Sequence, residues 1–347
     1  MKLIMGFIGF GKSTTRYHLP YVLVRNNIQV KTIYNIRRKP LLEKNYEKHD
    51  IHFTDKLNHL LQDVDVRLIT ICTPPSTHYE YAKKCLEHGK NVLVEKPFCT
   101  TEQEVKELLQ LANQKKLMIM PFQNRRFDSD FLALKEVINE GYVGDIVEVE
   151  SHLDYFRPEF HVVKGNYYDG SLYGLGVHTI DQMISLFGVP HKVFYDIRSV
   201  RNEGSPDDLF EVQMFYKKLK LSIKTSHLVK IPHPRFVLHG KRGSFVKYGI
   251  DQQETYLKAG IMPDAKGFGL DSIESYGLVV YIDEKGEEHE KIIPTPLGDY
   301  GKIYDNIYNV IFYNAIKLVS DVEILATIKI LENGFKYEEP IVMPLNI

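Results

Sequence analysis

The stretch Gly6-Phe-Ile-Gly-Phe-Gly-Lys-Ser13, with Thr14 directly behind it, matches two phosphate-binding patterns at once. Counted from Gly6 it reads G-x-x-x-x-G-K-S, the P-loop of nucleotide hydrolases, whose backbone amides and lysine hold phosphates. Counted from Gly9 it reads G-x-G-x-x-T, a dinucleotide-binding turn with threonine in place of the third glycine. The choice between the two patterns decides the fold and separates a nucleotide hydrolase from a redox enzyme.

The flanking sequence favours the dinucleotide turn. A P-loop beginning at Gly6 leaves a preceding strand of only about four residues, against a usual length of about 5–6. The best candidate for a magnesium-holding strand, residues 66–73, runs into Thr-Pro-Pro instead of ending in Asp. In the dinucleotide pattern the strand extends to Ile8, Gly9 forms the tight turn, and Gly11 admits a pyrophosphate at the helix N-terminus. The residues predicted to bind the cofactor in this turn are Gly9, Phe10, Gly11, Lys12, Ser13 and Thr14.

Alternating strands and helices follow this turn, which is the pattern of a parallel sheet covered on both faces. The expected strands are residues 2–8, 28–36, 66–73, 92–95 and 117–122, and the expected helices are 14–26, 76–88 and 101–115. We therefore predict that residues 1–123 form a doubly wound Rossmann domain.

After residue 126 the pattern changes to a series of strands with few helices between them. The expected strands are 146–156, 193–200, 209–216, 219–228, 236–247 and 278–293, with helices at 131–139, 171–186, 302–318 and 322–335. Residues 124–347 are therefore predicted to form an α+β domain with an open, mostly antiparallel sheet. Such a sheet needs cover on its second face, and we expect a homodimer or homotetramer to supply it.

Composition limits the partners of the chain. The 44 basic and 45 acidic side chains nearly cancel, so bulk charge gives no reason to expect a nucleic acid or a membrane surface. Three cysteines without metal-ligand spacing fit a reducing compartment better than a disulfide framework. No apolar run is long enough to span a membrane. We expect a cytoplasmic protein with a small-molecule substrate and no metal site.

The end of the second strand indicates which dinucleotide is bound. NAD-binding sheets carry an Asp or Glu there to hold the ribose 2′-hydroxyl, but the chain reads Tyr34-Asn-Ile-Arg-Arg-Lys39. Because guanidinium groups pair bidentately with phosphate, we predict that Arg37 and Arg38 bind the 2′-phosphate of NADP. The alternative is a solvated basic turn, and NAD stays possible.

Five segments resemble one family. They are GFGKSTTRYHLP at 9–20, CTPPSTHYEYA at 72–82, KNVLVEKPF at 90–98, QNRRFDSDF at 123–131 and SLYGLGVHTIDQ at 171–182. Together they resemble the glucose–fructose oxidoreductase / inositol dehydrogenase / MocA (Gfo/Idh/MocA) family, and within it a bacterial branch of unassigned substrate. The resemblance implies NAD(P)-dependent oxidation of CH–OH groups by a Rossmann domain followed by an α+β domain.

The resemblance also implies roles for residues after the strands at 66–73 and 92–95. Lys96 is expected to hydrogen-bond the oxygen being oxidised and to assist its proton transfer. Asn124, Arg125 and Arg126 can clamp the cofactor, hold an anionic substrate group, or merely pair with acids. We predict cofactor contacts for Thr73, Pro74, Pro75, His78, Glu95, Lys96, Asn124 and Arg125, and a substrate contact for Arg126.

His178 is the second catalytic candidate. In the resembled family an Asp four residues earlier forms an acid/base pair with this histidine, but here that position is Gly174. Three interpretations are open: another acid (Asp181, Asp169 or Asp154) takes over, the substrate fills the space with more bulk or its own anion, or catalysis is lost. We favour the second, in which Arg125, Arg126 or Arg157 meets the anion. The predicted substrate contacts are Lys96, Arg126, Tyr155, Tyr173, His178 and Asp181.

The sequence therefore predicts an NADP-dependent oxidoreductase that moves a hydride between the nicotinamide and a secondary alcohol or ketone of a sugar, inositol or related polyol. A non-catalytic NADP-binding sensor is the main alternative, because Gly174 breaks the acid/base pair. A P-loop nucleotide hydrolase is the remote alternative, supported only by the literal match at 6–13.

Overall fold

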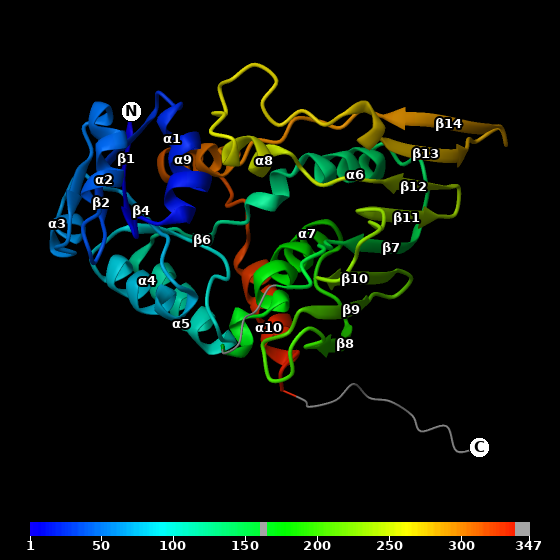
Figure 1. The fold of residues 1–347 in the computed structure, drawn as a ribbon, viewed down its shortest axis with the longest axis horizontal. Helices are drawn as coiled ribbons and strands as arrows, with labels where there is room; N and C mark the ends of the chain where they lie inside the picture. The colour runs from blue at the N-terminus through cyan, green and yellow to red at the C-terminus, as the bar shows by residue number, and fades with distance from the viewer. Residues whose placement is uncertain (160–164, 337–347) are drawn as a thin grey trace. The chain divides into compact units, whose positions relative to one another are not determined.

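The structure is a computed structural model that describes residues 1–159 and 165–336, and it divides into two compact units (Figure 1). The first unit contains Met1–Phe127 and two later segments, Gln252–Gly269 and Asp299–Ile328. The second contains Asp128–Asp251, Leu270–Gly298 and the described residues from Lys329 onward. The expected division after residue 123 stays a prediction, and the last residues of the expected second domain, 337–347, lie outside the described part of the chain.

The first unit is built on a six-stranded parallel sheet with the strand order β3-β2-β1-β4-β5-β6. This order is that of doubly wound dinucleotide-binding sheets, in which the ligand binds where the order reverses, here between β1 and β4. The strands are β1 Leu3–Ile8, β2 Ile28–Tyr34, β3 His52–Thr54, β4 Leu68–Ile71, β5 Asn91–Val94 and β6 Ile119–Pro121. The predicted Rossmann fold is confirmed.

Helices cover both faces of this sheet (Figure 1). Right-handed crossovers place α1, which follows β1, on one face and α4 and α5, which follow β4 and β5, on the other. The helical elements are η1 Thr14–His18, α1 Leu19–Leu23, α2 Pro40–Glu43, η2 Lys44–His49, α3 Asn58–Leu61, η3 Pro75–Thr77, α4 His78–Glu87, α5 Glu102–Lys115, η4 Asn124–Phe127, α8 Gln253–Lys258, α9 Lys302–Tyr313 and the part of α10 Asp321–Asn333 that precedes Lys329.

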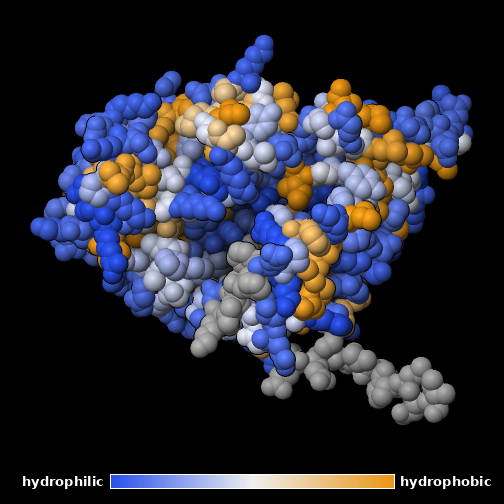
Figure 2. Space-filling view, viewed as in Figure 1, coloured by the Kyte–Doolittle hydropathy of each residue, from blue (hydrophilic) through white to orange (hydrophobic). Residues whose placement is uncertain are grey.

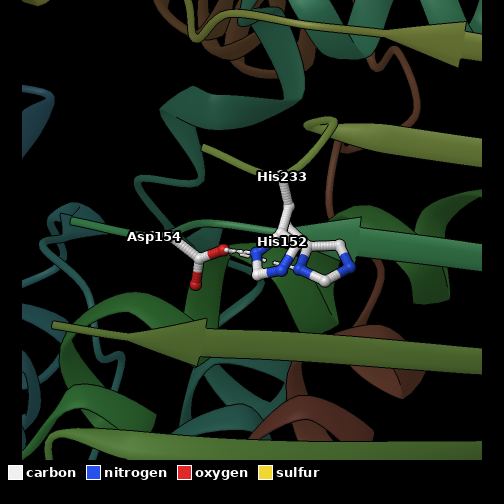
Figure 3. Close-up of side chains that lie close together, drawn as sticks. All are labelled: His152, Asp154 and His233. Atoms are coloured by element: carbon white, nitrogen blue, oxygen red, sulfur yellow. Dashed lines mark hydrogen bonds and ion pairs between the residues drawn. The ribbon is translucent and has the colours of Figure 1, made fainter. Parts of the chain in front are cut away.

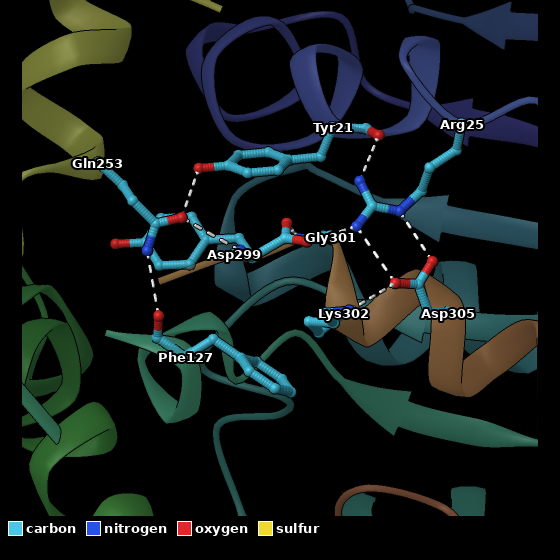
Figure 4. Close-up of polar contacts among 9 residues, drawn as sticks. Tyr21, Arg25, Phe127, Gln253, Asp299, Gly301, Lys302 and Asp305 are labelled. Atoms are coloured by element: carbon cyan, nitrogen blue, oxygen red, sulfur yellow. Dashed lines mark hydrogen bonds and ion pairs between the residues drawn. The ribbon is translucent and has the colours of Figure 1, made fainter. Parts of the chain in front are cut away.

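Polar contacts attach the two late segments to the first unit (Figure 4). Gln253 of α8 accepts a hydrogen bond from the Tyr21 hydroxyl at 2.8 Å and donates one to the Phe127 carbonyl at 3.1 Å. Arg25 pairs with Asp305 of α9 at 2.8 Å. Because a buried polar group that loses its partner costs about 1–3 kcal/mol, these contacts fix the late segments on the Rossmann sheet.

The second unit is built on an eight-stranded sheet in the order β14-β13-β12-β11-β7-β10-β9-β8. All neighbouring strands are antiparallel except β7 and β10, so the predicted mostly antiparallel sheet is confirmed. The strands are β7 Ile146–His152, β8 Lys192–Arg198, β9 Leu209–Phe215, β10 Lys220–Ser226, β11 Phe236–Gly240, β12 Gly243–Lys247, β13 Gly277–Ile282 and β14 Glu288–Ile293. The helical elements are α6 Ser129–Asn139, η5 Tyr167–Asp169, η6 Leu172–Gly176, α7 Val177–Phe187 and η7 Ile273–Ser275.

The two faces of this sheet differ in burial, as the period of two along a strand requires. Leu238, Phe245 and Val279 lie opposite one another on β11, β12 and β13 and are fully buried. On the other face, Val246 and Leu278 form a cross-strand pair and are only partly buried. The core of the second unit therefore lies on one face of its sheet.

Several element predictions differ from the structure. The helix expected to end at residue 318 ends at Tyr313, because Asn314 adopts a left-handed conformation with φ of 54°. The first helix ends at Leu23 instead of residue 26. The sequence pattern also missed α2, η2, β3 and α3, because elements this short show no hydrophobic period.

Hydrophilic residues cover most of the face seen in Figure 2, with hydrophobic residues in smaller areas. Such areas are normal on folded proteins, since apolar atoms contribute much of every protein surface. Within residues 1–159 and 165–336, no helix combines the length and the apolar character needed to cross a membrane.

Candidate functional site

The glycine turn after β1 shows which phosphate-binding pattern the opening stretch forms. Gly9 has a φ of 101°, and a Cβ there would lie 2.4 Å from the Cys72 carbonyl oxygen, so only glycine fits. At Gly11, by contrast, nothing lies within 4 Å of the Cβ position, which leaves room for a pyrophosphate against the backbone. Gly6 lies inside β1, with the Thr32 carbonyl oxygen 2.6 Å from its Cβ position. Because Gly6 is part of a strand, the P-loop interpretation is wrong.

Thr14 takes the place of the third glycine and closes the turn from inside. Its side chain is fully buried, and its Oγ1 donates a hydrogen bond to the Gly9 carbonyl at 2.7 Å. The helix begins at Lys12, which is exposed, and residues 14–18 form a π-helical turn, a distortion frequent at functional sites. The start of this helix presents unpaired backbone N–H groups and the positive end of its dipole, the donor set that suits a pyrophosphate.

Glu95, directly after β5, is a buried carboxylate that joins this helix to the lysine that follows. One oxygen accepts a hydrogen bond from the Ser13 hydroxyl and lies 3.0 Å from His18 Nε2. The other accepts a hydrogen bond from the Lys96 backbone N–H at 2.9 Å. Burial alone would raise the pKa of Glu95, but hydrogen bonds and charges from His18, Ser13 and Lys96 outweigh it and lower the pKa to about 2. Glu95 therefore positions the turn and Lys96 relative to each other, and its predicted cofactor contact stays a prediction.

Lys96 lies at the carboxyl edge of the parallel sheet, where ligands bind in this fold. It is partly buried, and burial is the main reason that its pKa lies below the usual value for lysine. Glu95 and Glu254 oppose this shift, and the positive charge of Arg125 adds to it. A lysine with a lowered pKa is suited to proton exchange near neutral pH. Glu254 comes from α8, far along the chain, so no pattern in the sequence pointed to it.

His78 holds the loop after β4 against the loop after β5. Its two ring nitrogens each lie 2.8 Å from a carbonyl oxygen, one of Thr73 and one of Pro97. The ring is fully buried, and burial lowers its pKa. In the same loop, Thr73 and Pro75 are partly buried and Pro74 is exposed. His78 therefore fixes the backbone beside Lys96, and its predicted cofactor contact stays a prediction.

The end of β2 carries Asn35 in the place of the acid that favours NAD. Asn35 Oδ1 accepts a hydrogen bond at 2.9 Å from the N–H of Phe10, a buried residue, so this amide supports the glycine turn. Arg38 binds Glu43 through two hydrogen bonds of 2.8 and 2.5 Å. Arg37 is exposed, and its guanidinium makes no hydrogen bond or ion pair with any residue that the structure describes. Two guanidinium groups therefore follow β2 where a carboxylate would select NAD.

The arginines of η4 make hydrogen bonds and ion pairs with other residues of the first unit. Arg126 is buried, donates a hydrogen bond to the Leu318 carbonyl at 2.8 Å, and pairs with Glu323 at 3.2 Å. A substrate contact of Arg126 would require breaking these bonds, so the contacts favour a structural role. Asn124 is buried, and Arg125 lies near Glu254, with 3.7 Å between the charged groups.

In the second unit, a cavity of about 190 Å³ lies beside the start of the η6–α7 helix. Gly174 lines it, and a Cβ at this position would meet nothing within 4 Å. Helix packing therefore does not require glycine here, and the space that an Asp side chain would fill is open. His178 is buried one helical turn further on. The charged and titratable residues that line the cavity are Arg157, Asp169, Arg201, Asp207, Asp208 and His227.

Asp207 is a carboxyl group of this cavity that the sequence analysis missed. It is buried, and burial raises its pKa to about 7, helped by the negative charge of Asp208. Its Oδ2 accepts a hydrogen bond from the Leu172 backbone N–H at 2.7 Å. Across the cavity, burial and nearby arginines lower the pKa of His227 to about 4, so this imidazole is neutral at pH 7. Asp207 lies in an irregular segment before β9, where no motif marks it.

The remaining predicted substrate residues differ in their surroundings. The Tyr173 ring is fully buried and packs against the rings of Tyr167 and Phe335, at centroid distances of 5.5 and 6.1 Å. This is the packing of a core side chain, and it does not support the predicted substrate contact. Asp181 is likewise buried on α7. The Tyr155 ring is partly buried, and the Arg157 guanidinium lies over it with its carbon 4.0 Å from the ring centroid.

A glycine turn at the switch point of a 3-2-1-4-5-6 sheet binds nicotinamide dinucleotides, and the lysine at its carboxyl edge suits proton exchange. These features define the class of protein as a nicotinamide-dependent oxidoreductase. Comparison with known proteins agrees. Residues 3–123 match the oxidoreductase-family NAD-binding Rossmann fold, and residues 135–340 match the oxidoreductase-family C-terminal alpha/beta domain. The chain belongs to the Gfo/Idh/MocA family of oxidoreductases.

Relatives resemble the chain over nearly its whole length. The oxidoreductase YhhX of Escherichia coli K12, named as uncharacterized, is 52% identical, with 98% of each chain covered. The scyllo-inositol 2-dehydrogenase (NADP(+)) IolW of Bacillus subtilis is 33% identical, with 94% of this chain and 91% of that protein covered. The crystal structure of an oxidoreductase from Bacillus cereus superposes with a TM-score of 0.96 at 52% identity, over 100% of this chain and 99% of the other.

Proposed function

We propose that the protein is an NADP-dependent dehydrogenase that exchanges a hydride between the nicotinamide and a secondary alcohol or ketone of an inositol or related polyol. The observation that carries the proposal is the partly buried Lys96 with its lowered pKa, held at the carboxyl edge of the dinucleotide sheet by Glu95. The relative named as an NADP-dependent scyllo-inositol dehydrogenase supports both the cofactor and the substrate class.

The preference for NADP rests on the two arginines after β2. The Arg37 guanidinium is exposed to a phosphate approaching from solvent, whereas Arg38 donates from Nε and Nη2 to Glu43 and would offer the phosphate its remaining N–H groups. The neutral amide of Asn35 offers no carboxylate to repel that phosphate or to hold a free 2′-hydroxyl. NADP binding should therefore be tighter than NAD binding.

The proposed chemistry divides between two side chains. Oxidation of the alcohol sends its carbon-bound hydrogen to the oxidised nicotinamide as hydride and its hydroxyl proton to a base. Lys96 donates a hydrogen bond to the reacting oxygen and stabilises the charge that develops there. His178 accepts the proton as the base. Asp207 lines the same cavity as Gly174, and we propose that it takes the place of the carboxyl group that the helix lacks.

The direct test is turnover with NADP⁺ and a panel of inositols, and with NADPH and the matching keto-inositols. Lys96→Met and His178→Ala should each lower kcat by about 10²–10⁴, the usual contribution of one positioned acid/base group. NADPH binding should persist in the His178→Ala variant. Turnover that is unaffected by both substitutions would contradict the assigned roles. NADPH binding without turnover on any polyol or keto-sugar would instead support the alternative function, a non-catalytic NADP-binding sensor.

A further inference from the structure

We propose that His152, Asp154 and His233 form a binding site for a divalent transition-metal ion of the zinc type. The three side chains lie at one end of the second unit's sheet, and their ligand atoms all lie within 4.8 Å of one another (Figure 3). No metal site was expected from the sequence. This inference does not rest on the proposed function.

Sheet register brings the three residues together. His152 is the last residue of β7, and Asp154 follows two positions later on the same side of the extended chain. Strand β11 pairs antiparallel with β7, with Phe236 opposite Ser151, so continuing this register places His233 opposite Asp154. Two neighbouring stretches of chain therefore contribute one ligand set, which only the folded sheet assembles.

The distances fit a metal-centred arrangement. Asp154 Oδ2 lies 3.4 Å from His152 Nδ1 and 3.1 Å from His233 Nδ1. Ligands bound tetrahedrally at about 2.0–2.1 Å from zinc lie roughly 3.3 Å apart, so both of these pairs already have the spacing of zinc ligands. Two imidazoles and one carboxylate are a ligand set that suits zinc and neighbouring transition metals better than magnesium or calcium.

The surroundings of His152 provide an independent indication of a metal site. Its side chain is only 8% exposed, yet its Nδ1 is buried without a hydrogen-bond partner, facing Asp154 in a geometry that does not make a hydrogen bond. A buried ring nitrogen that makes no hydrogen bond is costly, and a metal ion held between it and Asp154 Oδ2 would satisfy it.

His152 and Asp154 each contact a further polar group, as metal ligands commonly do to fix their orientation. The other nitrogen of His152, Nε2, lies 3.2 Å from a carboxylate oxygen of Glu150, which orients the ring; with the proton on Nε2, Nδ1 would be able to bind the ion. Asp154 Oδ1 accepts a hydrogen bond from the Ser226 backbone N–H at 2.8 Å, which leaves Oδ2 for the ion. The His233 side chain is 54% exposed, so an ion can enter from solvent and keep a water molecule as its fourth ligand.

The test is binding of the metal alone to the full-length protein. Calorimetric titration with Zn²⁺ should give one saturable site per chain, and Co²⁺ should develop the visible absorption of tetrahedral coordination. Saturating Zn²⁺ should raise the thermal midpoint by a few degrees, because an ion that binds only the folded chain stabilises it. His152→Ala and His233→Ala should each weaken binding at least about tenfold, the effect expected of a lost ligand or its orienting partner.

A second group, Asp283, Glu287 and His289, provides the matched control because it offers the same kinds of ligand at the β13–β14 hairpin. His289→Ala should leave the Zn²⁺ affinity unchanged. Unchanged thermal midpoints without metal and unchanged NADPH binding would show that the His152 and His233 variants are folded. The proposal is overturned if no saturable binding occurs, if binding is lost with His289, or if folded His152→Ala and His233→Ala variants bind as wild type does.

Discussion

Asp207 illustrates how one residue's surroundings set its chemistry. Its folded-state pKa of about 7 exceeds the ordinary value of 3.8, because burial penalises the charged carboxylate. Between these two pH values the folded chain holds a proton that the unfolded chain releases, so this group makes the folded state less stable as pH rises from about 4 to 7. His227, with its pKa lowered to about 4, makes the folded state more stable as pH rises through the same range. The pH dependence of wild-type stability alone would therefore not separate the contribution of Asp207.

We therefore predict a pH-dependent effect of Asp207→Asn. The amide keeps the acceptor for the Leu172 N–H but cannot ionise. Relative to wild type, the variant should gain roughly 2–4 kcal/mol in free energy of unfolding between pH 4 and pH 8, because the full shift of the Asp207 pKa is removed. Denaturant unfolding at a series of pH values checks this. A difference between the two proteins that is constant with pH would show that Asp207 does not titrate as described.

Among individual residues, the sequence pointed to candidate site residues that lie in recognisable motifs, and it did not point to those outside any motif. The glycines of the turn and Lys96 were predicted as site residues because they stand in known sequence motifs. Asp207 and Glu254 reach their sites through tertiary packing of irregular or distant segments, which leaves no local signature. Tyr173 was predicted as a substrate residue, but tyrosines also fill cores, and residue type alone does not separate the two roles.

The element that matters most is the strand, turn and helix of residues 3–23. The two glycines of its turn differ in what surrounds them: Gly9 has a left-handed conformation against the Cys72 carbonyl, whereas Gly11 leaves an open space. Glu95 ties the helix to the loop that carries Lys96. The glycine turn and Lys96 are therefore parts of one hydrogen-bonded assembly.

Two alanine substitutions should separate folding from binding in this element. Gly9→Ala should destabilise the first unit by roughly 1–3 kcal/mol, because the residue is forced into a strained conformation and contacts the Cys72 carbonyl. Gly11→Ala should fold with an unchanged thermal midpoint but bind NADPH at least about tenfold more weakly, since its methyl group occupies the space left for pyrophosphate. Thermal unfolding and NADPH titration of both variants check this. Equal behaviour of the two variants in both assays would contradict the distinction.

Across the whole molecule, the sheet of the second unit has one face that its own helices do not fully cover. Val237, Val246, Leu278 and Ile292 form a row of apolar side chains across four strands, and none of them is buried. We expect a second copy of the chain to cover this row, in a homodimer or homotetramer. The sequence predicted the open sheet from its strand pattern, but only the strand order shows which residues form the row.

Leu278→Glu tests that expectation. Placing a charge in the middle of the row should shift the protein toward monomers without loss of the fold, because the side chain already contacts solvent. Lys285→Gln, in the adjoining exposed turn, is the control because it changes the net charge by the same amount, minus one. Light scattering after size-exclusion chromatography gives the masses, and an oligomer that persists in the Leu278→Glu variant would place the interface elsewhere.

The measurement that tests the central claim most directly is a calorimetric titration with NADPH and NADH of wild type, the Arg37→Ala/Arg38→Ala double variant and the distant control Arg198→Ala. Wild type should bind NADPH more tightly than NADH, and the double variant should lose roughly 10–100-fold in NADPH affinity with little change for NADH, because only the 2′-phosphate contacts are removed. The control should match wild type. Equal affinities of wild type for the two cofactors, or NADPH binding that survives loss of both arginines, would contradict the assignment of an NADP-dependent oxidoreductase.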